Sequence, residues 1–207
     1  MNQIAIGTTV KDFTTGRIDD LRTELFRKTI HMLIGLVPLI AGYNRGFALA
    51  LLGGGTIIYS YSELLRAQGY NLGVISGIKQ YALRERDRGR FAGGPVTLAL
   101  GAMAALLFYP EDAAKIAIYA LAFGDGFASV AGKVFGTIKI PFTGGKTFEG
   151  SFACFIAVYI SAMTVTGSSR VSIILAAVVT AAEAFPLADY DNFVIPVTAG
   201  YAAMILL

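Results

Sequence analysis

Four groups of acidic, basic and hydroxyl side chains recur along the chain, each beside a long apolar stretch. A charged side chain in or at the end of a membrane helix costs about 2.5–3.5 kcal/mol on insertion scales, so such groups are candidates for function. In the first group, ELFRKTIH at 24–31, spacings of three, four and seven place four side chains on one helical face: Glu24, Arg27, Lys28 and His31. If this group has no function, the alternative is that Glu24 and Lys28 form an ordinary ion pair between residues four apart on a helix.

The second group is GDGFASVAGKVFG at 124–136. Asp125 ends an apolar run and Lys133 follows two turns later, so an acid and a base are expected to face one crevice that suits a metal nucleotide. Small residues recur every four positions and predict a helix face that a neighbouring helix or a ligand approaches closely: Gly124, Ala128, Gly132 and Gly136.

The third group is the loop PFTGGKTFEG at 141–150. Backbone N–H groups of a glycine-rich loop at a helix N-terminus attract phosphate, and a lysine adds to that attraction. The candidate nucleotide-binding residues of the loop are Gly144, Gly145, Lys146, Thr147 and Glu149. The loop is not a Walker motif, because that motif requires a glycine where position 140 is Ile, and a preceding strand.

The fourth group, EAFPLADYDNFVIP at 183–196, contains no lysine or arginine. Its carboxylates repel one another at the membrane edge and therefore require a cation; the oxygen donors are Glu183, Asp189, Asp191 and Asn192. A chain with one His and one Cys cannot build a zinc cluster, and oxygen donors favour Mg²⁺. The alternative is a solvated acidic turn, since Pro186 and Asp189 are both common in turns.

Membrane helices must position these groups. The mean hydropathy is +0.63, 55% of the residues are hydrophobic and 15% are charged, which excludes an ordinary water-soluble domain. We expect one all-α membrane domain over 1–207, with about seven transmembrane helices at 29–43, 46–62, 95–110, 113–130, 150–167, 171–187 and 193–207. The first is expected to begin earlier, because its apolar stripe continues back to Leu21. Residues 1–20 are polar and contain no signal-peptide core.

The basic residues fall mainly on one side of such a topology. The N-terminus and the second and fourth connections contain fourteen Lys and Arg, whereas the other connections contain only three: Arg45, Lys115 and Arg170. This bias predicts a cytoplasmic N-terminus, with 1–20 and 64–94 in the cytoplasm and the active site on that side. Within 64–94, apolar residues alternate with basic ones as in a helix lying at the membrane surface. A net charge of +3 does not indicate a nucleic-acid partner.

In this order, ELFRKTIH, GDGFASVAGKVFG, GGKTFEGS and the late E…D.DN..P pattern resemble the CTP-dependent lipid kinases. That family includes dolichol kinase, phytol and farnesol kinases and the yeast-type diacylglycerol kinase that uses CTP, and the resemblance extends from about Glu24 to Pro196. It implies transfer of the γ-phosphoryl group of CTP to the hydroxyl of a polyprenol, dolichol, phytol or diacylglycerol, with release of CDP. The implied cofactor is Mg²⁺, and the implied partners are CTP, the lipid alcohol and membrane lipids.

On this interpretation, carboxylates bind the metal or activate the hydroxyl, and cations bind the phosphates. The catalytic candidates are Asp125, Asp191 and Glu183, and the metal ligands are Asp125, Asp189, Asp191 and Asn192. The expected phosphate-binding cations are Arg27, Lys28, Lys133 and Lys146. Glu24 and His31 are further candidates, and His31 is either a base or a polar residue at the membrane surface. The residues leave open which carboxylate is the base, which alcohol is used and whether the chain forms a homo-oligomer.

Two other functions compete with this one. The central motifs are also similar to phosphatidate cytidylyltransferase, which makes a CDP-lipid, but a PGHGG-like or Asp-Arg signature is missing at the C-terminus and the chain is short for that enzyme. A transporter would also use buried acids and glycine-broken helices. We disfavour it because no acid or base is expected near the middle of a predicted helix, and we find no convincing internal repeat.

Overall fold

The computed structural model describes residues 21–70, 91–186 and 190–207, and the regular structure in these ranges is helical apart from an isolated bridge between Lys139 and Thr147. Residues 21–32 form a helix that continues through the 3-10 turn η1 (Leu33–Leu36) into α2 (Val37–Tyr43). The other helices are α3 (Arg45–Ala67), α5 (Gly94–Phe108), α6 (Glu111–Tyr119), α7 (Asp125–Phe135), α8 (Phe148–Thr166), α9 (Ser169–Ala184) and α10 (Asp191–Leu206). The π-helical turn η3 (Ala120–Gly124) joins α6 and α7 into one long helix.

Each of the seven predicted apolar stretches contains a helix, so the all-α prediction is confirmed for the described residues. Four helices in these ranges are long and apolar enough to cross a membrane: Leu21–Tyr43, Arg45–Arg66, Glu111–Phe135 and Phe148–Thr166. Two further apolar helices are shorter, Gly94–Phe108 and Asp191–Leu206. The first helix begins at least as early as Leu21, as its apolar stripe predicted.

The end predicted for the fourth apolar stretch, at residue 130, was wrong. The helix continues to Phe135, because nothing after Asp125 breaks it before Gly136, whose extended backbone ends it. Asp125 therefore lies inside a long helix and not at its end. It is the fifteenth of the 25 residues of Glu111–Phe135, so the expectation that no acid lies near the middle of a predicted helix, which counted against a transporter, is also wrong.

The connection predicted over 64–94 is shorter than expected. The helix α3 continues to Ala67, and α5 begins at Gly94 with Pro95 in its first turn, where the missing N–H of proline is tolerated. The surface helix predicted within this connection lies outside the described residues, as does Asp189.

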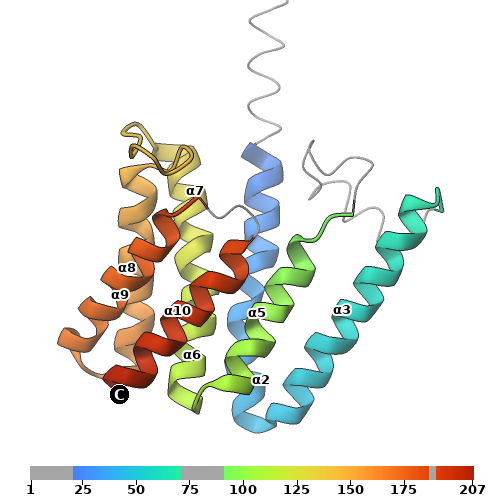
Figure 1. Cartoon of the computed structure of the whole chain (residues 1–207), viewed down its shortest axis with the longest axis horizontal. Coiled ribbons are helices and arrows are strands. Elements are labelled where there is room, and N and C mark those ends of the chain that lie inside the picture. The colour runs from blue at the N-terminus through green and yellow to red at the C-terminus, as the bar shows by residue number, and fades with distance from the viewer. Residues whose placement is uncertain (1–20, 71–90, 187–189) are drawn as a thin grey trace, which may run out of the picture.

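The continuous helix of α6, η3 and α7 is the centre of the bundle (Figure 1). Of its most apolar window, 67% is buried, against 17–28% for the other three long helices. Ile116, Ile118 and Leu121 are fully buried within it. The helices α8, α9 and α10 pack around it, whereas α3 lies at the edge against α2 and α5. The beginning of the first helix, the end of α7 and the start of α10 share one end of the bundle with the loop before α8 (Figure 1).

Glycines set the closest helix crossings near that end. A Cβ at Gly150 would lie 2.8 Å from the carbonyl oxygen of Ala128 and 3.3 Å from the Cα of Gly132, so α7 and α8 cross with their backbones nearly in contact. The predicted small-residue face thus packs one helix against another. A Cβ at Gly101 would lie 2.0 Å from the carbonyl oxygen of Asn192, which brings α5 against the start of α10. These crossings fix the helix ends that carry the polar groups.

Candidate active site

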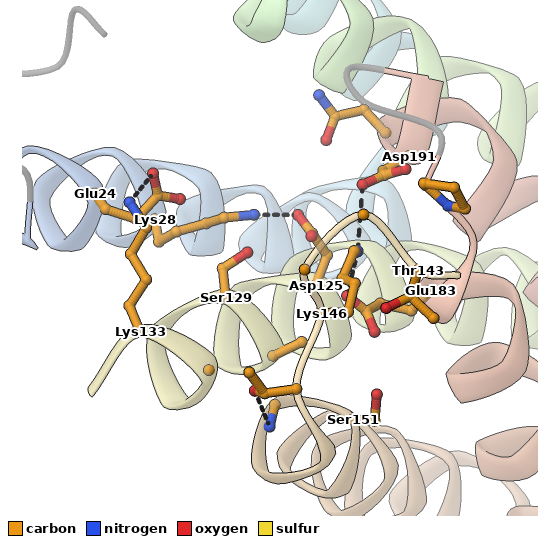
Figure 2. A pocket seen from close by; sticks show the side chains of 18 of the residues that line it. Glu24, Lys28, Asp125, Ser129, Lys133, Thr143, Lys146, Ser151, Glu183 and Asp191 are labelled. Carbon is orange, nitrogen blue, oxygen red and sulfur yellow. Dashed lines mark hydrogen bonds and ion pairs between the residues drawn. The ribbon is translucent and has the colours of Figure 1, made fainter. Parts of the chain in front are cut away.

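A cavity of about 600 Å³ lies at this end of the bundle, between the first helix, α7, the loop before α8 and the facing ends of α8, α9 and α10 (Figure 2). Side chains from all four polar groups of the sequence line it. The predicted site residues in its lining are Glu24, Arg27, Lys28, Asp125, Lys133, Gly144, Gly145, Lys146, Thr147, Glu183, Asp191 and Asn192. Segments that are far apart in the chain therefore form one site.

Asp125 is held by two side chains of the first helix. Lys28 forms an ion pair with Oδ2 of Asp125, and Nε2 of His31 lies 3.3 Å from the same oxygen. All three side chains are at most 5% exposed. Asp125 and Lys133 both line the cavity, but they do not contact each other, because eight residues of helix separate them by roughly 12 Å along the axis. His31 itself does not line the cavity, since its ring packs behind Asp125.

Glu24 binds the remaining cations of this wall. Arg27 forms an ion pair with Oε1 of Glu24, and Nζ of Lys133 lies 3.1 Å from Oε2. The ordinary pair between Glu24 and Lys28, expected from their spacing alone, is replaced by the long-range pair of Lys28 with Asp125. Each cation of this wall therefore has a carboxylate partner.

A π-helical turn directly precedes Asp125. The N–H of Asp125 donates to the carbonyl of Ala120, five residues earlier, where a regular α-helix would use the residue four earlier. Nε2 of His31 lies 2.9 Å from the carbonyl oxygen of Leu121 in the same turn. Such turns within α-helices are frequent at functional sites, and this one lies where Asp125 meets Lys28.

Lys146 extends from the loop toward two carboxylates that belong to different helices (Figure 2). Its Nζ forms an ion pair with Oε1 of Glu183 and lies 3.6 Å from Oδ2 of Asp191. Burial lowers the pKa of Lys146, but the charges of Glu183 and Asp191 raise it by more than burial lowers it. The pKa therefore lies above its usual value, and the side chain is a cation at neutral pH. Burial raises the pKa of Asp191 to about 6 although Lys146 opposes the shift, so ionised Asp191 depends on a neighbouring cation.

The loop before α8 has the glycine-rich geometry that its sequence predicts. Gly144 and Gly145 adopt positive φ angles of 70° and 101°, which glycine reaches without the steric cost of a Cβ. Thr147 then caps α8, since its hydroxyl accepts a hydrogen bond from the N–H of Gly150 at 3.2 Å. Lys146 therefore lies between a glycine turn and the capped start of α8.

Two predicted site residues have other contacts. Glu149 is partly exposed and does not line the cavity; it accepts hydrogen bonds from the backbone N–H groups of Thr137 and Ile138, at 2.9 and 3.2 Å. Glu149, in the first turn of α8, thus fixes the backbone at the start of the preceding loop. Asn192 lines the cavity, but its amide donates to Oγ1 of Thr97 at 2.9 Å and to the carbonyl of Gly94 at 3.3 Å, which ties α10 to α5.

Three hydroxyl residues in the lining were not identified from the sequence: Ser129, Thr143 and Ser151. Ser129 follows Asp125 by four residues and Ser151 follows Thr147 by four, so helical spacing was the signal that could have found them. Three lining residues carry buried polar atoms with no hydrogen-bond partner among the described residues: Nε of Arg27, Oγ of Ser151 and Oε2 of Glu183. Buried polar atoms are normally satisfied, so these are atoms that a polar ligand would satisfy.

The donor set fits a divalent cation that also binds phosphate. In the described ranges, no three His, Cys, Asp or Glu side chains come together as a complete metal site. Glu183 and Asp191 instead form a pair around Lys146. Mg²⁺ is commonly bound by one or two carboxylates, with water and substrate phosphates completing its shell. The predicted ligand Asp125 faces Lys28, and the predicted ligand Asp189 is outside the described residues.

Comparison with known proteins gives one consistent result. No protein-family model and no solved structure matches the chain. Curated relatives include a probable chloroplastic phytol kinase of Triticum aestivum, 26% identical over 90% of this chain and 68% of its own length. A chloroplastic farnesol kinase of Arabidopsis thaliana is 29% identical over 68% of this chain and 47% of its own. Phytol kinase 1 of the same plant is 24% identical over 88% of this chain and 66% of its own. The resemblance to lipid-alcohol kinases is confirmed, and the chain spans about half to two thirds of these relatives.

Proposed function

We propose that the chain is a membrane kinase that transfers the γ-phosphoryl group of CTP to the hydroxyl of an isoprenoid alcohol of the phytol or farnesol type. The observation that carries the proposal is the cavity in which Lys28, Lys133 and Lys146 meet Asp125, Glu183 and Asp191 at the end of a bundle of apolar helices. Similarity to proteins named phytol kinase and farnesol kinase supports the acceptor class.

In the proposed reaction, the alcohol oxygen attacks the γ-phosphorus of CTP. The new O–P bond forms as the bond between this phosphorus and the oxygen bridging to the β-phosphate breaks, and CDP leaves. The hydroxyl proton passes to a carboxylate, for which Asp125 is the candidate because it lies inside a helix that reaches into the apolar part of the bundle. Lys28 and His31 hold that carboxylate in position.

Phosphoryl transfer depends mainly on positioning and charge neutralisation, and this site offers groups for both. Lys146 and Arg27 would bind phosphate oxygens, together with the hydroxyls of Thr143 and Ser151 and the backbone N–H groups of the glycine loop. Glu183 and Asp191 would hold Mg²⁺, which when bound neutralises charge on the phosphates.

The donor and the direction of transfer can be tested with labelled CTP. Purified protein is incubated with Mg²⁺ and phytol, farnesol, a polyprenol or diacylglycerol, and the CTP carries label in either the γ- or the α-phosphate. We expect the γ label in the lipid and CDP in solution, and we expect no transfer once EDTA removes the divalent cation. Pyrophosphate with α label in the lipid would instead identify a cytidylyltransferase.

We also propose seven membrane spans with a cytoplasmic N-terminus and the cavity on the cytoplasmic side. The proposal is supported by the distribution of Lys and Arg, fourteen against three, and by the cytosolic origin of CTP. It predicts that Ile138, in the loop before α8, and Asp112, at the start of α6, face opposite sides of the membrane.

Labelling of single cysteines tests this topology. In a Cys154→Ser background, which removes the chain's one thiol, Ile138→Cys should react with an impermeant maleimide only in inverted vesicles. Asp112→Cys should react only in intact cells. Both native residues are exposed, so lack of reaction reflects the membrane and not burial. The reverse pattern would invert the topology, and reaction of both on one side would rule out an odd number of spans between them.

A further inference from the structure

The Lys146 ammonium has an environment that differs from that of the other cavity cations. Lys28 faces Asp125, and Arg27 and Lys133 share Glu24. Lys146 contacts two carboxylates that come from separate helices, Glu183 near the end of α9 and Asp191 at the start of α10.

The two carboxylates are enclosed, and one of their oxygens is unused. Glu183 is 2% exposed, and its Oε2 has no hydrogen-bond partner among the described residues. The side chain of Asp191 is 17% exposed. A buried and a partly buried carboxylate without a cation between them would repel each other, so the ammonium stabilises their approach. The ammonium contacts Oε1 of Glu183 and leaves Oε2 unused, so this oxygen is available to a divalent cation bound between the two carboxylates.

The backbone of Lys146 is fixed, because its carbonyl accepts a hydrogen bond from the N–H of Ile140 at 2.9 Å, so a movement of the ammonium requires a change of the side chain alone. Gly144 and Gly145 directly precede it with positive φ angles, and open space surrounds the Cβ position of Gly145. The cavity next to Lys146 is also the space that would receive phosphates. A shift of the side chain toward a phosphate would exchange one set of oxygen partners for another.

We propose that Glu183 and Asp191 form a divalent-cation site that the Lys146 ammonium fills until the phosphates of a nucleotide draw it away. The inference rests on the proposed function for the identity of the nucleotide. A divalent cation alone must displace a lysine that then has no partner, and a nucleotide alone must take a lysine away from two carboxylates. Binding of either ligand alone therefore costs free energy, because it leaves the lysine or the two carboxylates without a counter-charge. Together the two ligands supply both missing partners, so they bind cooperatively.

The cation site can be measured without nucleotide and without catalysis. Mn²⁺ is titrated into purified protein in detergent, and the electron paramagnetic resonance signal of free Mn²⁺ reports binding. Lys146→Met removes the competing ammonium, so we expect Mn²⁺ to bind at least about tenfold more tightly than to the wild type. Lys146→Met/Glu183→Gln should return affinity to the wild-type level. Lys139→Met is the matched control, since it removes an exposed lysine of the same connection that does not line the cavity, and it should leave Mn²⁺ affinity unchanged.

The outcomes separate this inference from the proposed function. Equal Mn²⁺ affinity in Lys146→Met and the wild type, or a gain that survives Glu183→Gln, overturns the cation site whatever the enzyme's activity. A gain that depends on Glu183, in a protein that transfers no phosphate from CTP, supports the cation site and overturns the proposed function. Size-exclusion chromatography and thermal melting verify the fold of each variant, and Lys146→Ser replaces Lys146→Met if the longer side chain impairs folding.

Discussion

Replacement of Asp125 by Asn is expected to lower turnover of CTP and lipid alcohol by at least about a hundredfold, roughly 2.7 kcal/mol of activation free energy. Asparagine keeps the size of the side chain but cannot accept the hydroxyl proton or carry a negative charge into the cavity. The loss should appear in kcat, because the carboxylate acts on the reacting hydroxyl. Turnover is measured with γ-labelled CTP and the preferred alcohol.

The same substitution should also destabilise the protein, because it leaves the buried ammonium of Lys28 without its counter-charge. Removing both charges in Asp125→Asn/Lys28→Met should therefore restore part of the thermal stability lost in Asp125→Asn. Asp125→Glu, which keeps the charge but moves the carboxylate, is the variant for activity measurements if Asp125→Asn does not fold.

Asp112→Asn is the control for the loss of an acid from the same long helix. Asp112 is exposed at the opposite end of this helix, where it pairs only with Lys115 among the residues described, so its loss should change neither turnover nor melting temperature appreciably. A folded Asp125→Asn protein with nearly full turnover would make Asp125 a structural residue and move the catalytic assignment to Asp191 and Glu183.

Replacement of Lys146 by Met is expected to lower kcat/KM for CTP by about a hundredfold or more, because the CTP phosphates lose the charge of a partly buried ammonium. Most of the loss should appear as a higher KM for CTP, and the KM for the lipid alcohol should change little. Steady-state kinetics with each substrate varied in turn separates the two effects.

Lys139→Met provides the matched comparison for Lys146. Lys139 belongs to the same connection between α7 and α8 and is exposed, but its side chain does not line the cavity. Its replacement should leave both KM values near those of the wild type. Equal losses in the two variants would mean that the overall positive charge of the loop attracts CTP and that Lys146 has no specific contact with it.

Much of the architecture follows from local features of the sequence. The apolar stretches predicted the positions of all seven helical segments, because hydropathy and helical period act over neighbouring residues. Gly144 and Gly145 before Lys146 predicted the turn and the helix start that the structure contains. The four polar groups were recognised because charge next to a membrane helix is costly wherever the helix finally packs.

The tertiary structure alone decided which acid meets which base. Spacing within one helix indicated an ordinary pair of Glu24 with Lys28 and placed Asp125 and Lys133 at one crevice. In the structure Asp125 pairs with Lys28, 97 residues away, and Glu24 pairs with Lys133, 109 residues away. Such pairs depend on how α7 crosses the first helix, where a Cβ at Gly126 would lie 2.8 Å from Cε of Met32, and on the π-helical turn before Asp125. Packing of separate helices acts between residues far apart in the chain, so no local pattern encodes it. For the same reason the sequence could indicate Lys146, Glu183 and Asp191 as charged candidates, while only the packing of α9 and α10 against the loop brought them into contact.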